Sequence, residues 1–271
     1  MNFLNGSGVI FAPHVDDETL GCGGTLARLP HKKAWHVVYA TDGMRSLEPD
    51  IPWRDKVPPE LGRIRQEEAR AALSMLGIPS ENIHFLGFPD GKLSRHKREL
   101  CRAMTEWIRA WRPDHVLVPF RYDRHPDHLA VNRAGTALAK TQKIKCDLIE
   151  YIVYSKWRLL PEGYVRRYIR PELLRKVDIT AVAAIKRAAL DAFKSQTTCF
   201  LDWQVRPTLP EALLEQACRE PECFLPYDAR FEGASIFTRS AFRIRVVHSL
   251  EPWLHKRRNQ VSVLWHRLVG A

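Results

Sequence analysis

Short apolar runs alternate with helically spaced segments through the first 155 residues of the chain. Such runs are typical of buried strands, and the segments that follow them carry apolar residues on one helix face. We expect strands at residues 8–13, 35–40, 83–86, 115–119 and 148–154, and helices at 19–29, 59–76, 95–111 and 127–140. Strict alternation of strand and helix builds βαβ units. The pattern therefore predicts an α/β fold with a mostly parallel sheet flanked by helices on both faces.

Beyond about residue 155 the pattern becomes mixed, and only a helix at about 180–194 stands out. The chain has no internal repeat and no Gly- and Ser-rich stretch that would mark a linker. Its 271 residues suit one α/β domain. We therefore predict a single domain over residues 1–271 that ends in a C-terminal extension.

The composition narrows the class of protein. Apolar residues make up 45% and charged residues 27%, which excludes a disordered or fibrous chain. The net charge of +11 favours an anionic partner: a phosphorylated or lipid-linked substrate, a membrane surface, or nucleic acid. The six scattered cysteines form no C-x-x-C pair, and we interpret them as reduced thiols of a cytoplasmic protein. We expect neither a signal peptide nor a spanning helix, so any membrane contact would be peripheral.

Two polar clusters follow predicted strands and precede predicted helices. The first is Ala12-Pro-His-Val-Asp-Asp-Glu18, and the second is Arg121-Tyr-Asp-Arg-His-Pro-Asp-His128. Ligands of an open parallel sheet bind outside the carboxyl ends of the strands, so the fold should bring both clusters to one edge. Carboxylates at a helix start and Pro126 in a first turn also have a purely structural explanation. That explanation does not account for a His₂Asp set, which is the ligand pattern of an open, catalytic zinc site.

These motifs resemble those of the LmbE/PIG-L zinc-dependent N-deacetylases. The resemblance rests on His14-Val-Asp16-Asp17-Glu18 with Leu20-Gly-Cys-Gly-Gly24, and on His125-Pro-Asp127-His128. Further matching pieces are Thr41-Asp-Gly43, Arg65-Gln-Glu-Glu68-Ala69, Leu76-Gly77, Phe88-Pro-Asp90-Gly91 and Lys186…Ser195-Gln196. The resemblance implies a Rossmann-like core over about residues 8–196, an extension over about 197–271, and removal of an N-acetyl group from a GlcNAc-type sugar. The chain departs from the family at Phe193, where members often have His.

The resemblance also implies roles for single residues. The zinc ligands would be His14, Asp17 and His128, with one zinc ion per chain. Asp16 then remains as the general base, which takes the proton of the attacking water. His125 would donate to the tetrahedral oxyanion.

Each of three further residues has two possible roles. Asp127 would orient a histidine, or it is an ordinary carboxylate at a helix N-terminus. Arg65 would reach the substrate sugar, or it pairs with Glu68 on the same helix face. Asp90 would contact a substrate hydroxyl, or Pro-Asp-Gly is simple turn chemistry.

The sequence also allows functions other than deacetylation to be weighed. Gly21-Cys-Gly-Gly24 follows the first strand, but three neighbouring carboxylates would repel a pyrophosphate, so we expect no dinucleotide. Two alternatives remain: a zinc-dependent amidase of a thiol conjugate, or a basic nucleic-acid- or membrane-binding protein with a vestigial metal site. Of the anionic partners, we do not expect nucleic acid.

Two further segments have predicted roles. The segment 44–62 is long enough to form a substrate lid. The basic, Trp-containing segment 243–269 is predicted either to pack as a terminal helix or to dock on anionic membrane near a lipid-linked substrate.

Overall fold

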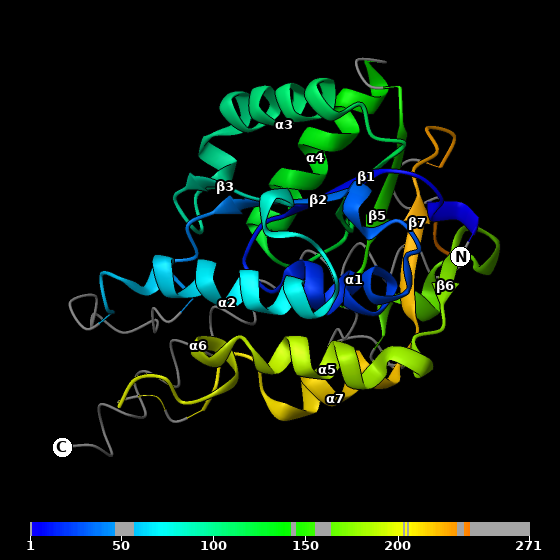
Figure 1. The fold of residues 1–271 in the computed structure, drawn as a ribbon. Helices are drawn as coiled ribbons and strands as arrows, with labels where there is room; N and C mark the ends of the chain where they lie inside the picture. The colour runs from blue at the N-terminus through cyan, green and yellow to red at the C-terminus, as the bar shows by residue number, and fades with distance from the viewer. Residues whose placement is uncertain are drawn as a thin grey trace.

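A computed structural model describes residues 2–46, 57–141, 145–154, 164–202, 204, 206–231 and 236–238. Their centre is a seven-stranded sheet in the order β3-β2-β1-β4-β5-β7-β6 (Figure 1). The strands are β1 (Gly8–Ala12), β2 (Trp35–Thr41), β3 (Ile83–Phe88), β4 (His115–Pro119), β5 (Asp147–Tyr151), β6 (Arg175–Val177) and β7 (Glu222–Pro226). β1 to β5 run parallel, whereas β7 is antiparallel to both β5 and β6. The predicted mostly parallel α/β sheet is confirmed.

Helices cover both faces of this sheet. They are α1 (Asp17–Arg28), α2 (Leu61–Met75), α3 (Lys97–Trp111), α4 (Pro126–Lys140), α5 (Ala183–Asp191), α6 (Lys194–Thr197) and α7 (Glu211–Arg219). Figure 1 shows α3 and α4 on one face and α1, α2 and α5 on the other. Successive strand residues point to opposite faces, so Ile10 of β1 packs in the core beneath α1 and α2, while its neighbours Val9 and Phe11 pack against α3 and α4.

The sequence pattern missed β6 and β7. β6 has only three residues, two of them the exposed Arg175 and Lys176, so it carries no strand periodicity. β7 pairs with β5 across about seventy residues of chain, with Tyr151 opposite Phe224. Neither local spacing nor composition encodes such a long-range pairing. The nine predicted elements of the first 155 residues are all present, with ends that differ by at most three residues.

A buried ion pair joins the C-terminal part of the chain to α1. The Lys186 Nζ lies 2.7 Å from Glu222 Oε1 and donates to the Leu20 carbonyl at 2.8 Å. Glu222 also accepts from the backbone N–H groups of Gly24 and Thr25, each at 2.7 Å, and from the Thr25 hydroxyl. The network fixes α1, and with it the polar turn that precedes this helix.

Removing one partner of this pair should destabilise the fold strongly. Lys186→Met leaves the Glu222 carboxylate buried without its cation, so we expect the free energy of unfolding to fall by about 3–5 kcal/mol. Arg63→Met is the matched control, because Arg63 forms an exposed pair with Glu67 and such pairs contribute about 1 kcal/mol or less. Urea denaturation of both variants measures the difference. A loss at Lys186 no larger than at Arg63 would contradict the prediction.

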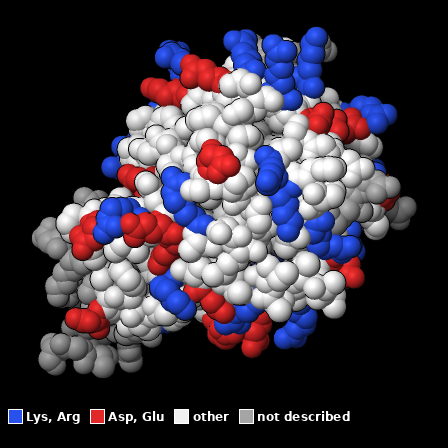
Figure 2. Space-filling model, viewed as in Figure 1, with Lys and Arg blue, Asp and Glu red and all other residues white. Residues whose placement is uncertain are grey.

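Charges are mixed over the visible surface. Figure 2 shows basic side chains scattered among acidic ones, with a group of basic side chains along the upper edge, where α3 lies. Exposed basic residues of α3 are Lys97, Arg98, Arg102 and Arg109. None of the helices in the described ranges is long and apolar enough to span a bilayer. The segment 243–269, and residues 47–56 of the expected lid, lie outside the described residues, so membrane docking and lid function stay predictions.

Candidate metal centre

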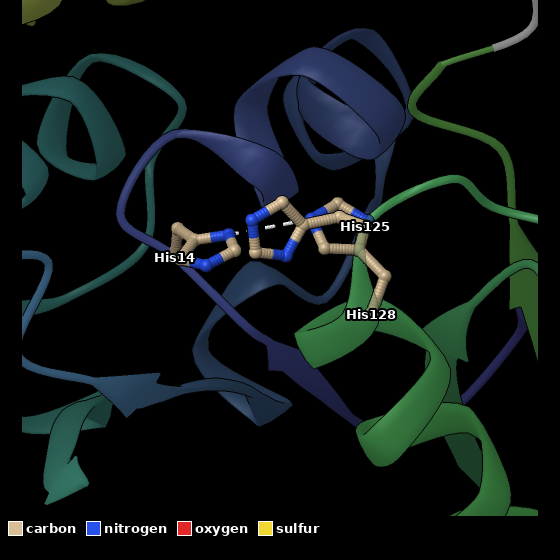
Figure 3. A group of neighbouring side chains, drawn as sticks. All are labelled: His14, His125 and His128. Carbon is tan, nitrogen blue, oxygen red and sulfur yellow. Dashed lines mark hydrogen bonds between the residues drawn. The ribbon is translucent and has the colours of Figure 1, made fainter. Parts of the chain in front are cut away.

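The two polar clusters meet at the carboxyl ends of β1 and β4, which are neighbours in the sheet. From β1 the chain adds β2 and β3 on one side of the sheet, and it then returns to add β4 on the other side of β1, so the order of the strands reverses between β1 and β4. Such a switch point is where open α/β sheets bind ligands. His14 comes from the turn between β1 and α1, whereas His125 and His128 come from the start of α4, and the three rings gather in one place (Figure 3).

Three ligand-type atoms from the two clusters lie in mutual contact. The Asp17 Oδ2 is 3.0 Å from His14 Nδ1 and 3.0 Å from His128 Nε2, and the two nitrogens are 3.3 Å apart. Tetrahedral zinc with bonds of about 2.0–2.1 Å separates its ligand atoms by roughly 3.3–3.4 Å, close to this triangle. The other Asp17 oxygen, Oδ1, is buried with no hydrogen-bond partner in the described part of the chain. These residues fit a metal ion with three protein ligands.

The charge states suit cation binding. Burial raises the pKa of Asp17, but His128 and His14 outweigh it and hold that pKa well below its usual range. The Asp17 carboxylate is therefore anionic although it is fully buried. An anionic oxygen between two imidazole nitrogens is the chemistry of a divalent metal site.

Carboxylates also lie near the ring nitrogens of His14 and His128 that are not part of the triangle. His14 Nε2 lies 3.2 Å from Asp90 Oδ1 and 3.4 Å from Asp127 Oδ2, and His128 Nδ1 lies 3.1 Å from Asp123 Oδ2. Carboxylates in such positions fix the ring orientation and tautomer of metal-binding histidines.

Two other ligand combinations are close enough for a metal ion. Ligand atoms of His14, His125 and His128 lie within 4.8 Å of one another, and so do those of His14, Asp90 and Asp127. The first combination has no carboxylate, and the second has only one histidine. Only the triangle of His14, Asp17 and His128 places an anionic oxygen against imidazole nitrogens from both polar clusters, so we take it as the candidate metal position.

His125 stands at the N-terminus of α4 beside the histidine pair. Its Nδ1 accepts a hydrogen bond from the Asp127 backbone N–H at 3.2 Å, which caps the helix. Burial, reinforced by His14 and His128, lowers the pKa of His125 to about 4. The ring is therefore neutral, and with Nδ1 accepting, its proton is on Nε2. This geometry makes His125 a hydrogen-bond donor through Nε2.

Asp16 has an unusual backbone conformation next to the ligand Asp17. Its φ of 118° lies in the left-handed region, which costs a non-glycine residue about 1–3 kcal/mol. Burial raises the pKa of Asp16 to about 8, and the cation of Arg65 opposes this rise. The Asp16 carboxyl is thus buried beside the triangle with a pKa near neutrality, as general bases require.

Arg65 and Glu68 of α2 serve separate contacts. Arg65 is only 1% exposed and donates to backbone carbonyls and to Asp16. Glu68 instead accepts from the Ser195 N–H and hydroxyl, both at 2.7 Å. The Gln196 amide then bridges Ser195 and Ser46. These bonds account for the Ser-Gln motif after α5, and nearby Phe193 is fully buried in the apolar core.

Sequence reasoning gave no role to two residues of the site. Asp123, against His128, lies within the second cluster, so its carboxylate type was the available signal. The Tyr154 ring stacks on His128, with centroids 5.7 Å apart and planes at 28°. Its signal in the sequence was its position shortly after β5, at the same edge of the sheet.

The N-terminal half of the chain matches a known protein family. The PIG-L family, described as GlcNAc-PI de-N-acetylase, matches residues 9–139. Both polar clusters and most of the parallel sheet fall in this range.

Several curated relatives are named as deacetylases. The chain is 33% identical over 134 residues to an uncharacterized deacetylase, YaiS, of Escherichia coli K12, covering 47% of this chain and 65% of the relative. It is 35% identical over 122 residues to the diacetylchitobiose deacetylase of Thermococcus kodakarensis, covering 43% and 42%. These two alignments span less than two thirds of the relatives. A 1D-myo-inositol 2-acetamido-2-deoxy-alpha-D-glucopyranoside deacetylase of Saccharopolyspora erythraea is 29% identical over 228 residues, covering 68% and 81%.

Solved structures share the fold. The N,N'-diacetylchitobiose deacetylase of Pyrococcus horikoshii superposes with a TM-score of 0.60 at 21% identity, over 84% of this chain and 86% of that one. The conserved protein TT1542 of Thermus thermophilus gives 0.56 at 26% identity, over 81% and 93%.

Proposed function

Because the chain belongs to the PIG-L/LmbE family of deacetylases, we propose that it hydrolyses the N-acetyl group of a GlcNAc-containing conjugate with one zinc ion. The observation that carries the proposal is the triangle of His14 Nδ1, Asp17 Oδ2 and His128 Nε2, with sides of 3.0–3.3 Å. These three side chains would hold the ion. Bound there, zinc would lower the pKa of water and polarise the amide carbonyl.

The surrounding residues supply the proton transfers. Asp16 is the base that takes a proton from the attacking water and returns it to the departing amine, because its carboxyl is adjacent to the ligand Asp17. His125 donates from Nε2 to the oxyanion that forms at the carbonyl oxygen, a role worth about 3–4 kcal/mol in comparable sites. Both steps use the protonation states described above, a neutral imidazole and a carboxyl with a pKa near neutrality.

Three carboxylates orient the ligands. Asp127 and Asp90 face His14 Nε2, and Asp123 faces His128 Nδ1, so the nitrogens Nδ1 and Nε2 respectively point to the metal position. For Asp90, this contact favours orientation of His14 over the substrate contact that the family resemblance implies. Its second oxygen accepts from the Arg45 backbone N–H at 3.0 Å, which engages the carboxylate further.

The substrate class follows from the family and from charge. The net charge of +11 favours an acidic conjugate, so we propose a phosphate- or lipid-linked GlcNAc. The alternative, an amidase of a thiol conjugate, would use the same ligands and base on another amide.

A substrate panel tests the proposal. Zinc-loaded protein is incubated with N-acetylglucosaminyl-inositol, its phosphatidyl form, N-acetylglucosaminyl malate, diacetylchitobiose and an N-acetylated thiol conjugate, and released amine is quantified. We expect the wild type to release amine from at least one GlcNAc conjugate, and His128→Ala to release at least 10³-fold less. Release only from the thiol conjugate would favour the amidase, and release from no member would overturn the proposed function.

A further inference from the structure

The backbone N–H and the backbone carbonyl of Asp16 both form hydrogen bonds. Its N–H donates to Glu18 Oε2 at 3.3 Å, and its carbonyl accepts from the Leu20 N–H at 2.9 Å. The carbonyl of the preceding Val15 accepts from the Arg65 Nη2. Asp16 and Arg112 are the non-glycine residues with positive φ in the described ranges. This backbone conformation is unfavourable for Asp16, so the contacts around it are needed to hold it.

Arg65 restrains the side chain of Asp16 as well. The same Nη2 that binds the Val15 carbonyl lies 3.1 Å from Asp16 Oδ2. Nη1 donates to the Gly43 carbonyl at 3.0 Å. A planar guanidinium fork can make these contacts together, whereas a lysine ammonium is a single point charge. Arg65 thus fixes both the Val15–Asp16 peptide and, through Oδ2, the carboxylate of Asp16.

The surroundings of Arg65 enclose its side chain within the protein. The side chain is 1% exposed, and its remaining Nε is also buried, without a hydrogen-bond partner among the described residues. Gly43 lies against the guanidinium with a φ of +64°, and a Cβ there would be 2.7 Å from Nη1. Glycine is therefore required at this position for close approach of the backbone to Arg65.

Glu18 completes the restraint from the other side. It is fully buried, and its Oε1 accepts from the Thr19 hydroxyl at 2.5 Å. This contact orients the carboxyl whose Oε2 receives the Asp16 N–H. The Asp16 peptide therefore lies between a carboxyl on α1 and a guanidinium on α2.

We propose that Arg65 is a positioning residue for the base Asp16 and does not contact the substrate sugar. It acts by holding Asp16 Oδ2 and the Val15 carbonyl, so that the carboxylate keeps one orientation toward the attacking water. The inference rests on the proposed function, because it takes Asp16 as the base. It differs from the substrate contact that the family motif suggests.

A double-mutant cycle on the zinc-loaded, full-length enzyme tests the proposal. Arg65→Met should lower kcat about 100-fold with KM changed less than threefold and zinc content unchanged. In an Asp16→Asn background, the same Arg65→Met change should lower kcat less than threefold further, because the group through which Arg65 acts is already gone. Arg65→Lys should recover part of kcat, and Arg63→Met, an exposed arginine on the same helix, should match the wild type.

A crystal structure of Arg65→Met, or of Arg65→Lys if the first variant does not fold, gives a readout independent of turnover. We expect the φ of Asp16 to leave the left-handed region or its carboxylate to rotate. A tenfold rise in KM with kcat unchanged, additive losses in the cycle, or an unmoved Asp16 would overturn the positioning role. If the wild type hydrolyses nothing in the panel, the proposed function fails, while the structure of the variant still decides whether Arg65 holds Asp16.

Discussion

Removal of zinc should abolish amide hydrolysis, and His128→Ala should reproduce that loss permanently. His128 Nε2 is one corner of the triangle with Asp17 Oδ2 and His14 Nδ1, and the ring is fully buried. Without it, two protein ligands remain, which do not retain zinc against a strong chelator. We expect wild-type protein to bind about one zinc per chain, and His128→Ala to lose both the metal and at least 10³-fold in kcat.

Metal analysis by mass spectrometry and amine-release assays measure both losses. The control is His31→Ala, because His31 is exposed and lies outside the site. Dialysis against a chelator should inactivate the wild type, and added zinc should restore its activity but not that of His128→Ala. A purified wild-type protein that is active without bound metal would contradict the assignment of this centre.

The convergence of the two clusters was predictable from the sequence, because strand alternation alone places the ends of β1 and β4 at one edge of the sheet. The pairing of the ligand atoms was not, since it depends on rotamers that spacing does not encode. The same holds for the carboxylates: Asp123 and Asp127 both lie in the second cluster, yet in the folded protein they contact different histidines, which the sequence does not show.

Arg65 shows where motif reasoning reaches its limit. Its position in a motif indicated a role near the site, and the structure agrees that it lies there. Whether it faces the substrate or the protein depends on burial and on the Gly43 and Val15 carbonyls, which come from segments far apart in sequence. Likewise, β7 joins the sheet through long-range pairing and through the buried pair of Glu222 with Lys186, which no local pattern reveals.

The isosteric changes Asp16→Asn and Asp17→Asn should separate the base from the ligand. Asp16→Asn removes the proton acceptor but leaves the triangle intact, so we expect a full complement of zinc and a kcat reduced about 10²–10⁴-fold, the usual contribution of general base catalysis. Asp17→Asn removes the anionic oxygen between the two histidines, so zinc affinity should fall and activity should recover partly at high zinc concentration.

The comparison is sharp because the two residues are neighbours with similar burial, and both variants preserve side-chain shape. Zinc affinity measured by competition with a chromogenic chelator, together with kcat at saturating zinc, gives two numbers for each variant. A loss of zinc from Asp16→Asn with retention by Asp17→Asn would exchange the two roles. Because Asp17 Oδ2 contacts both histidine nitrogens, whereas Asp16 Oδ2 contacts Arg65, we expect zinc affinity to fall in Asp17→Asn alone.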